Sequence, residues 1–109
     1  MALKRTANSK RASLPRSSDY TKSFLKDWTR LSRSGRYDLN RLKSVMMLLI
    51  ENDAPLPAEW LDHPLKGEMA AYRECHIGGD FLLIYRIDDS RQPEMVIFVR
   101  AGTHSELLE

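Results

Sequence analysis

Residues 70–104 constrain the fold most, because they contain three β-rich segments in succession. Residues 70–77 alternate between apolar and polar side chains, Gly78-Gly79 can supply a two-residue hairpin turn, and residues 81–87 form a nearly continuous apolar run. After a polar turn at 88–93, residues 95–99 form a third segment that leads into Arg100. We therefore predict three strands, with residues 81–87 at the centre of the sheet.

Two amphipathic helices are predicted before these strands. From about residue 19 to 33 the apolar residues recur at helical spacing, and Ser18 or Asp19 is available to cap the first turn. Gly35 interrupts the pattern, and Asp38 can cap a second helix that runs to about residue 50. The two buried stripes are predicted to be Tyr20, Phe24, Trp28 and Leu31, and then Leu39, Leu42, Met46 and Leu49. The short connection predicts a helical hairpin, with Met46 and Met47 in the core.

The remaining segments indicate one domain with a basic tail. At 109 residues and 12.6 kDa the chain fits a single domain, which we place at 11–109 after a flexible tail at 1–10. Residues 11–16 could form an edge strand, where Pro15 is tolerated, and the prolines within 52–67 predict a loop. No apolar run has the roughly 20 residues that span a bilayer, and no signal peptide is recognisable, so a cytoplasmic location is expected.

The charge is distributed unevenly along the chain. The formal net charge is only +2, but residues 1–50 carry twelve Lys or Arg against three Asp, and residues 51–109 carry five against twelve acidic residues. On the first helix, the basic residues three to four positions apart would form one ridge: Lys22, Lys26, Arg30 and Arg33. Such a ridge can bind a polyanion by displacing its counterions, although a solvated helix face gives the same pattern.

The three histidines, His63, His76 and His104, all lie in the second half of the chain, and Arg100 comes four residues before His104. Imidazole changes charge near neutral pH, so histidines that meet in space can donate and accept protons in one reaction. An arginine beside them suits a phosphate or a developing anion. Residues 103–106 fit a capping box, which predicts a short C-terminal helix beginning at His104.

No metal site or cofactor is predicted. Cys75 and His76 are adjacent on a predicted strand, so their side chains point to opposite faces and cannot share one ion. The sequence contains no His-x-x-x-His or Cys-x-x-Cys spacing, phosphate loop or dinucleotide fingerprint. The single cysteine is expected to be a buried thiol. Structural interpretations remain open for two further residues: Asp80 could close the hairpin turn, and Arg100 could pair with a carboxylate such as Glu74.

Taken together, the motifs of the second half follow a known pattern. They are His63-Pro64-Leu65-Lys66-Gly67, Tyr72-Arg73, His76, Asp80, Leu83-Ile84-Tyr85, Phe98, Arg100 and Gly102-Thr103-His104 with Leu107. The chain closely resembles the YafQ branch of the RelE/ParE superfamily of toxins over residues 18–108. It departs from the pattern at Phe81, where Trp is common, and at Leu108, where an aromatic residue is common.

The resemblance implies an α+β, RelE-like fold, in which a helical hairpin packs on a small, twisted, mostly antiparallel sheet. It implies a toxin of a type II toxin–antitoxin system, a ribosome-dependent endoribonuclease that cleaves mRNA at the decoding site without a cofactor. The expected partners are a cognate antitoxin, the ribosome and mRNA, with operator DNA bound only through the antitoxin and no membrane. The site residues that the resemblance implies are His63, His76, Asp80, Arg100 and His104, with Phe81 as a substituted neighbour. Phe81, Arg73 and the basic ridge, which is inferred from the spacing of its charges, are expected to bind substrate.

The chemistry expected from this set is metal-independent attack of a ribose 2′-oxygen on the adjacent phosphate, which leaves a 2′,3′-cyclic phosphate and a 5′-hydroxyl. His104 is expected to act as the acid, His76 or Asp80 as the base, and Arg100 as the charge stabiliser, with His63 in a positioning or proton-transfer role. Two alternatives remain. A ParE-like toxin would inhibit a protein target such as gyrase without catalysis, and an RNA-binding module would bind RNA without cutting it.

Overall fold

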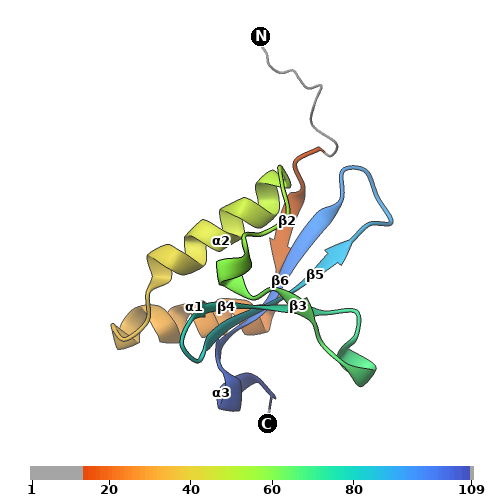
Figure 1. The fold of residues 1–109 in the computed structure, drawn as a ribbon. Helices are drawn as coiled ribbons and strands as arrows, with labels where there is room; N and C mark the ends of the chain where they lie inside the picture. Colours follow the sequence, from red (N-terminus) through yellow and green to blue (C-terminus); the bar gives the residue numbers. More distant parts are fainter. Residues whose placement is uncertain (1–13, 109) are drawn as a thin grey trace.

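The computed structural model describes residues 14–108 and contains one mixed sheet covered on one face by two helices (Figure 1). The elements in chain order are β2 (Ser17–Tyr20), α1 (Lys22–Ser34), α2 (Leu39–Glu51), the 3₁₀ turn η1 (Ala58–Trp60), β3 (His63–Pro64), the 3₁₀ turn η2 (Gly67–Met69), β4 (Arg73–Gly78), β5 (Phe81–Asp88), β6 (Met95–Thr103) and α3 (His104–Leu108). The strand order is β2-β6-β5-β4-β3. Only the β2–β6 pair is parallel, so the predicted mostly antiparallel α+β fold is confirmed.

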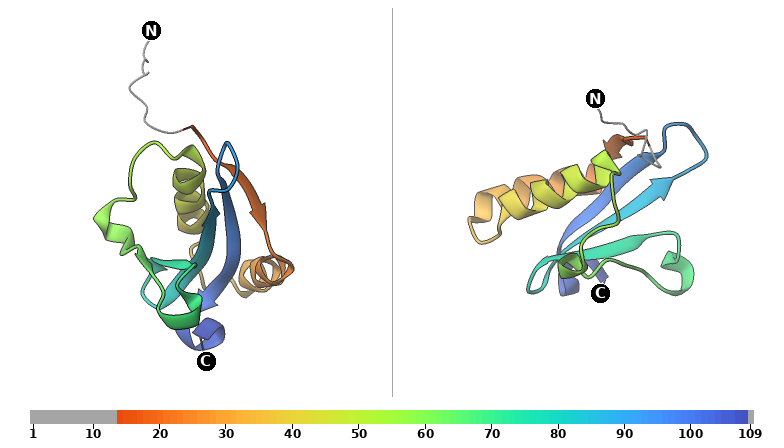
Figure 2. Two further views of the ribbon diagram at one scale, coloured as in Figure 1. Left: turned by 90° about the vertical axis from the view of Figure 1, so that its right-hand side faces the viewer. Right: turned by 45° about the horizontal axis from the view of Figure 1, so that its top comes forward.

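The core lies between the helices and one face of the sheet. Phe24 and Leu31 of α1 and Leu42 of α2 are buried there, as their helical spacing predicted. Figure 2 shows both helices on the same side of the sheet and α3 at the far end of β6. The central strand β5 has five buried residues in succession, at positions 81–85, which agrees with the predicted apolar run.

The first helix begins later than predicted. Thr21, and neither Ser18 nor Asp19, is its N-cap: the Thr21 Oγ1 accepts a hydrogen bond from the Phe24 N–H at 3.0 Å. The preceding residues instead form β2 beside β6, so the edge strand expected at 11–16 lies at 17–20, and residues 11–13 are outside the described part. Tyr20 is consequently 54% exposed and does not belong to the buried stripe of α1.

Two further details differ from the sequence analysis. Met47 is 52% exposed, so only Met46 of the methionine pair packs against the core. The tight turn between β4 and β5 is formed by Gly79 and Asp80, because Gly78 is the last residue of β4 and Gly79 takes a left-handed conformation (φ 54°). Gly35, which was predicted to interrupt the helical pattern, is the C-cap of α1 (φ 68°), and the predicted N-cap of α2 at Asp38 is confirmed.

The predicted tail at 1–10 lies outside the described residues. Among residues 14–108, none of the helices has the length and apolar character needed to cross a membrane.

Candidate active site

Three side chains gather where the two-residue strand β3 pairs with β4. His63 is directly opposite Glu74 in the ladder, and His76 follows two residues later on the same face of β4. The Glu74 Oε2 lies 3.1 Å from the His63 Nε2 and 3.5 Å from the His76 Nε2. The two imidazole rings are 6.0 Å apart between centroids. The structure therefore brings two of the three histidines together around a carboxylate that the sequence analysis did not include in the site.

Glu74 is the most constrained member of this cluster. It is only 4% exposed, and its Oε1 is buried without a hydrogen-bond partner among the described residues. The two imidazoles remain accessible to solvent. His63 also faces the Pro64 carbonyl oxygen at 3.1 Å from its Nδ1, so each of its ring nitrogens meets an acceptor. A protonated His63 ring would donate at both positions.

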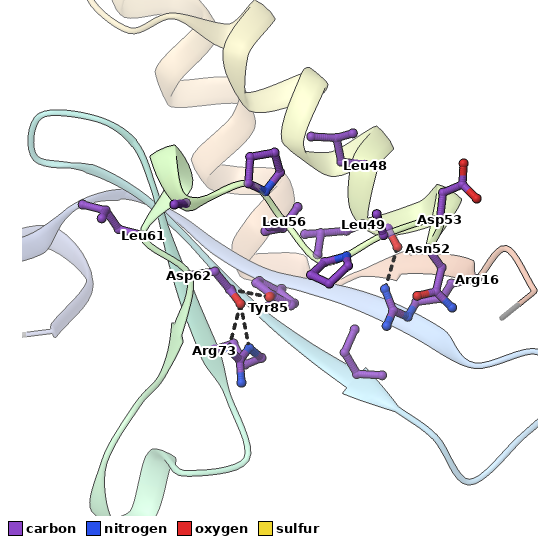
Figure 3. Close-up of a pocket in the computed structure, with 15 residues that line it drawn as sticks. Arg16, Leu48, Leu49, Asn52, Asp53, Leu56, Leu61, Asp62, Arg73 and Tyr85 are labelled. Carbon is purple, nitrogen blue, oxygen red and sulfur yellow. Dashed lines mark hydrogen bonds and ion pairs between the residues drawn. The ribbon is translucent and has the colours of Figure 1, made fainter. Parts of the chain in front are cut away.

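The loop that carries His63 is anchored from the other face of the sheet. Asp62 accepts two hydrogen bonds from Arg73, at 2.7 and 3.1 Å, and a third from the Tyr85 hydroxyl (Figure 3). Burial and the Asp62 carboxylate raise the pKa of Tyr85, so this hydroxyl stays a donor. The three side chains line a pocket of about 690 Å³ between the 52–62 loop and the sheet. Arg73, predicted to bind substrate, thus lies on the opposite face from its neighbour Glu74 and holds the loop in place.

Strand pairing relates the site residues on β3 and β4 to Arg100 on β6. His63 pairs with Glu74, Glu74 with Ile84, and Ile84 with Arg100, so these side chains share one face. Since neighbouring strands are about 4.8 Å apart, the backbones of Glu74 and Arg100 lie about 10 Å from each other across the sheet. That span suits one nucleotide. Strand register therefore assigns His63, His76 and Arg100 to the same face of the sheet, while their convergence on one phosphate stays a prediction.

Arg100 is held by a residue that the sequence analysis missed. Asp27 of α1 is 3% exposed and accepts hydrogen bonds from the Arg100 Nε at 2.7 Å and Nη2 at 3.1 Å. Burial alone would raise the pKa of Asp27, but hydrogen bonds from Arg100, from the Ala101 N–H and from Arg30 together lower it. The partner of Arg100 is Asp27, whereas the sequence analysis considered Glu74. One signal could have revealed Asp27: it falls between Phe24 and Leu31 on the buried stripe.

His104 begins the predicted short helix. The capping box is confirmed, because the Thr103 N–H donates to the Glu106 Oε1 at 2.8 Å and the Glu106 N–H donates to the Thr103 Oγ1 at 3.3 Å. The Asp80 Oδ1 accepts a hydrogen bond from the His104 backbone N–H at 3.3 Å. Asp80 therefore connects the β4–β5 turn to the start of α3, and the exposed His104 side chain follows the end of β6.

Of the residues expected to bind substrate, the aromatic one is buried and most of the basic ones are exposed. Phe81 is 5% exposed and its ring packs 4.9 Å from Tyr37, so a base cannot stack on it without rearrangement. The strand alternation turns Phe81 into the core, and its expected role in binding substrate stays a prediction. The side chain of Leu108 lies outside the described part. On α1, Lys22, Lys26 and Arg33 are exposed, while Arg30 is bound to Asp27 and Glu106.

Cys75 is not part of the cluster that could bind a metal ion. Cys75 is fully buried, and burial with the nearby Asp62 and Glu74 charges raises the pKa of its thiol to about 12, which excludes a thiolate nucleophile at neutral pH. His63, Glu74 and His76, however, have ligand atoms within 4.8 Å of one another. Two imidazoles and a carboxylate are ligands that zinc or copper accepts, a possibility that the spacing of the histidines in the sequence did not indicate.

Comparison with known proteins shows to which family this chain belongs. Residues 16–109 match the family model described as "Bacterial toxin of type II toxin-antitoxin system, YafQ". The chain belongs to the YafQ family. It is 39% identical over 94 residues to the mRNA interferase toxin YafQ of Escherichia coli K12, covering 86% of this chain and 97% of that protein.

Solved structures of similar toxins agree with this fold. The E. coli DinJ-YafQ toxin–antitoxin complex contains a chain that is 38% identical, with a TM-score of 0.74, covering 88% of this chain and all of the other. A metal-bound toxin from Helicobacter pylori is also 38% identical, with a TM-score of 0.75, covering 85% of this chain and 99% of the other.

Proposed function

We propose that this protein is the toxin of a type II toxin–antitoxin system and an endoribonuclease that cleaves mRNA on the ribosome. Family membership and the E. coli relative's name, mRNA interferase, support this proposal. The observation that carries it is the surface on which His63, Glu74, His76 and Arg100 lie together. It supplies proton-transfer groups and a cation about one nucleotide apart.

The proposed reaction is an intramolecular transfer at phosphorus. The ribose 2′-oxygen bonds to phosphorus, the bond from phosphorus to the 5′-oxygen breaks, and a 2′,3′-cyclic phosphate and a 5′-hydroxyl result. The proton of the 2′-hydroxyl must pass to a base, and the departing 5′-oxygen must receive another from an acid. No group outside the protein and RNA is needed to balance these transfers.

The base is assigned to His76 together with Glu74. Their atoms are 3.5 Å apart, so the carboxylate can orient the ring and stabilise the imidazolium that forms. His63 shares the same carboxylate and would add positive charge near the phosphate when it is protonated. Asp80, the other base considered from the sequence, bonds to the backbone of His104 and is better suited to holding that residue in place.

Arg100 is assigned to stabilise the negative charge that develops on the phosphate, and His104 to protonate the leaving 5′-oxygen. The Arg100 side chain remains partly exposed while it binds Asp27. His104 lies two residues beyond Gly102, which shares a ladder row with His76 through Leu82. Base and acid are therefore separated by the width of the site, as attack and departure on opposite sides of phosphorus require. The exposed Lys22, Lys26 and Arg33 would add non-specific attraction for RNA.

The partners and location follow from this activity. The E. coli relative has been crystallised with DinJ in a toxin–antitoxin complex, so an antitoxin encoded for this protein is the expected inhibitor. Ribosomes and mRNA are the expected targets, which places the protein in the cytoplasm. A ParE-like toxin that acts without catalysis, or a module that only binds RNA, would not need two imidazoles around a buried carboxylate.

A reconstituted assay tests the proposal. Purified protein is added to ribosomes programmed with one defined mRNA, and the new ends are examined for a 5′-hydroxyl and a 2′,3′-cyclic phosphate. We expect cleavage by the natural protein and by Ser105→Ala, a neighbouring exposed control, and a loss of about 10²- to 10⁴-fold for His104→Ala. Cleavage by His104→Ala at the natural rate would contradict the assignment of the acid. Absence of any cleavage by the natural protein would contradict the proposed function.

A further inference from the structure

A chain of charged contacts joins α1 to both groups that the proposed site takes from the end of β6. Asp27 binds Arg100, and its Oδ1 also accepts a hydrogen bond from the Arg30 Nη2 at 3.1 Å. The Arg30 Nη1 donates to the Glu106 Oε2 at 2.8 Å. The other oxygen of Glu106 accepts the Thr103 N–H, one residue before His104. The path therefore runs without a gap from the phosphate-binding arginine to the helix that carries the proposed acid.

We propose that Asp27 and Glu106, joined through Arg30, are positioning residues that orient Arg100 and His104 for cleavage. This inference rests on the proposed function, and it assigns a catalytic contribution to residues that do not contact the RNA.

Asp27 fixes the plane of the Arg100 guanidinium. The two hydrogen bonds from Nε and Nη2 form a fork, which is the geometry that restrains arginine most strongly. They use two of its five N–H donors, and in the part of the chain that the structure describes the other three have no protein partner. Those donors point away from Asp27 on a side chain that is partly exposed. The hydrogen bonds to Asp27 also raise the pKa of Arg100, so its positive charge is maintained.

Glu106 fixes the position of α3. Hydrogen bonding from the Thr103 N–H lowers the pKa of Glu106, and Arg30 lowers it further, against an opposing effect of burial. The contact crosses Gly102 closely: a Cβ placed there would lie 2.7 Å from the Glu106 Oε1 and 3.2 Å from the Arg30 Nη2. A five-residue helix has little stability of its own, so its orientation depends on this contact and on Asp80.

A purely structural role for Asp27 is the alternative. Its Oδ2 accepts the Ala101 N–H at 3.0 Å and so satisfies a backbone donor of β6 beyond the end of β2. That bond would stabilise the protein without any effect on catalysis. The experiment must therefore measure catalysis and folding separately.

Four variants of the toxin are compared with the natural protein by kcat and KM on ribosomes and by thermal unfolding. Asp27→Asn is made alone and combined with Arg100→Ala, and Arg100→Ala is made alone. Glu94→Gln is the matched control, because it likewise replaces a carboxylate by an amide: it removes the negative charge of Glu94, which lies 3.1 Å from Arg16 in an ion pair beside the start of β6. All rates are measured well below the lowest unfolding temperature.

We expect Asp27→Asn to lower kcat by about 10- to 100-fold with a smaller change in KM, because a small displacement of a charge stabiliser is costly. Adding it to Arg100→Ala should cause no further loss of kcat, since the residues would act as one unit. Glu94→Gln should keep the natural kcat. A natural kcat for folded Asp27→Asn, or a full additional loss in the double variant, would overturn the inference.

Glu106 gives a second test that does not depend on a buried residue. Glu106→Gln retains an oxygen that can accept the Thr103 N–H, whereas Glu106→Ala removes it. We expect Glu106→Ala to lower kcat by about 10-fold or more and Glu106→Gln to restore most of it. Equal and natural kcat values for both would contradict the role of Glu106. Failure of the natural protein to cleave would instead contradict the proposed function.

Discussion

Replacing Glu74 by methionine should stabilise the protein and inactivate it. The Glu74 carboxylate is 4% exposed, and its Oε1 has no hydrogen-bond partner among the described residues. An unpartnered buried polar atom costs about 1–3 kcal/mol. Methionine has a similar length and no polar oxygen, so the substitution removes this cost without leaving a large cavity.

The contacts between Glu74 and the two histidines contribute less to stability than this cost. His63 and His76 keep 48% and 31% of their side chains exposed, so water can replace the carboxylate beside each ring. Partly exposed ion pairs contribute about 0–1 kcal/mol. A net gain of about 1 kcal/mol would raise the midpoint of thermal unfolding by about 4–8 °C for a domain of this size. Because Glu74 orients the proposed base, kcat should fall by about 10²-fold or more.

The assay combines thermal unfolding with cleavage of mRNA on ribosomes. Glu68→Met serves as the control, since Glu68 is exposed and its substitution should change stability by less than about 0.5 kcal/mol. A fall in the unfolding midpoint of Glu74→Met would show that the carboxylate stabilises the fold. A more stable variant with natural kcat would show that the carboxylate takes no part in cleavage. Either result would refute the reasoning.

Metal chelation, pH and the loop anchor give three further predictions. EDTA should leave cleavage unchanged, whereas added Zn²⁺ should inhibit cleavage because it would bind His63, Glu74 and His76. A loss of activity in EDTA that an added metal restores would contradict the metal-independent mechanism. Because the pKa of Asp27 is lowered in the folded protein, its contribution to stability is fully present above the ordinary pKa of 3.8 and is lost as the pH falls below that value. Below this pH, the urea midpoint of the natural protein should therefore fall more steeply than that of Asp27→Asn. Asp62→Ala should displace the loop that carries His63 and lower both stability and kcat, measured by unfolding and cleavage, whereas an unchanged kcat would separate the loop anchor from the site.

Local sequence patterns predicted most of the elements because their signals depend on near neighbours. Helical spacing gave the buried stripe through Phe24 and Leu31, and the capping box gave α3. The start of α1 was missed because Ser18, Asp19 and Thr21 can all cap a helix. Only the parallel pairing of β2 with β6, nearly 80 residues away in the chain, decides between them.

The site was predicted in part for a related reason. Its histidines and Arg100 were found through resemblance to a family, but the two carboxylates that hold them were not. Glu74 was one of twelve acidic residues in its half of the chain, and only strand register places it between two imidazoles. Asp27 meets Arg100 across 73 positions of sequence, so no local pattern could pair them. The contact of the Phe81 ring with Tyr37 likewise joins distant parts of the sequence.

The most direct measurement is a map of cellular RNA 5′ ends shortly after the toxin is induced without its antitoxin. The account predicts new 5′-hydroxyl ends within coding sequences and arrest of growth, and the loss of both when His63, His76 and His104 are replaced together by alanine. Growth arrest by that triple variant with no new 5′-hydroxyl ends would contradict the account and favour a toxin that acts on a protein target.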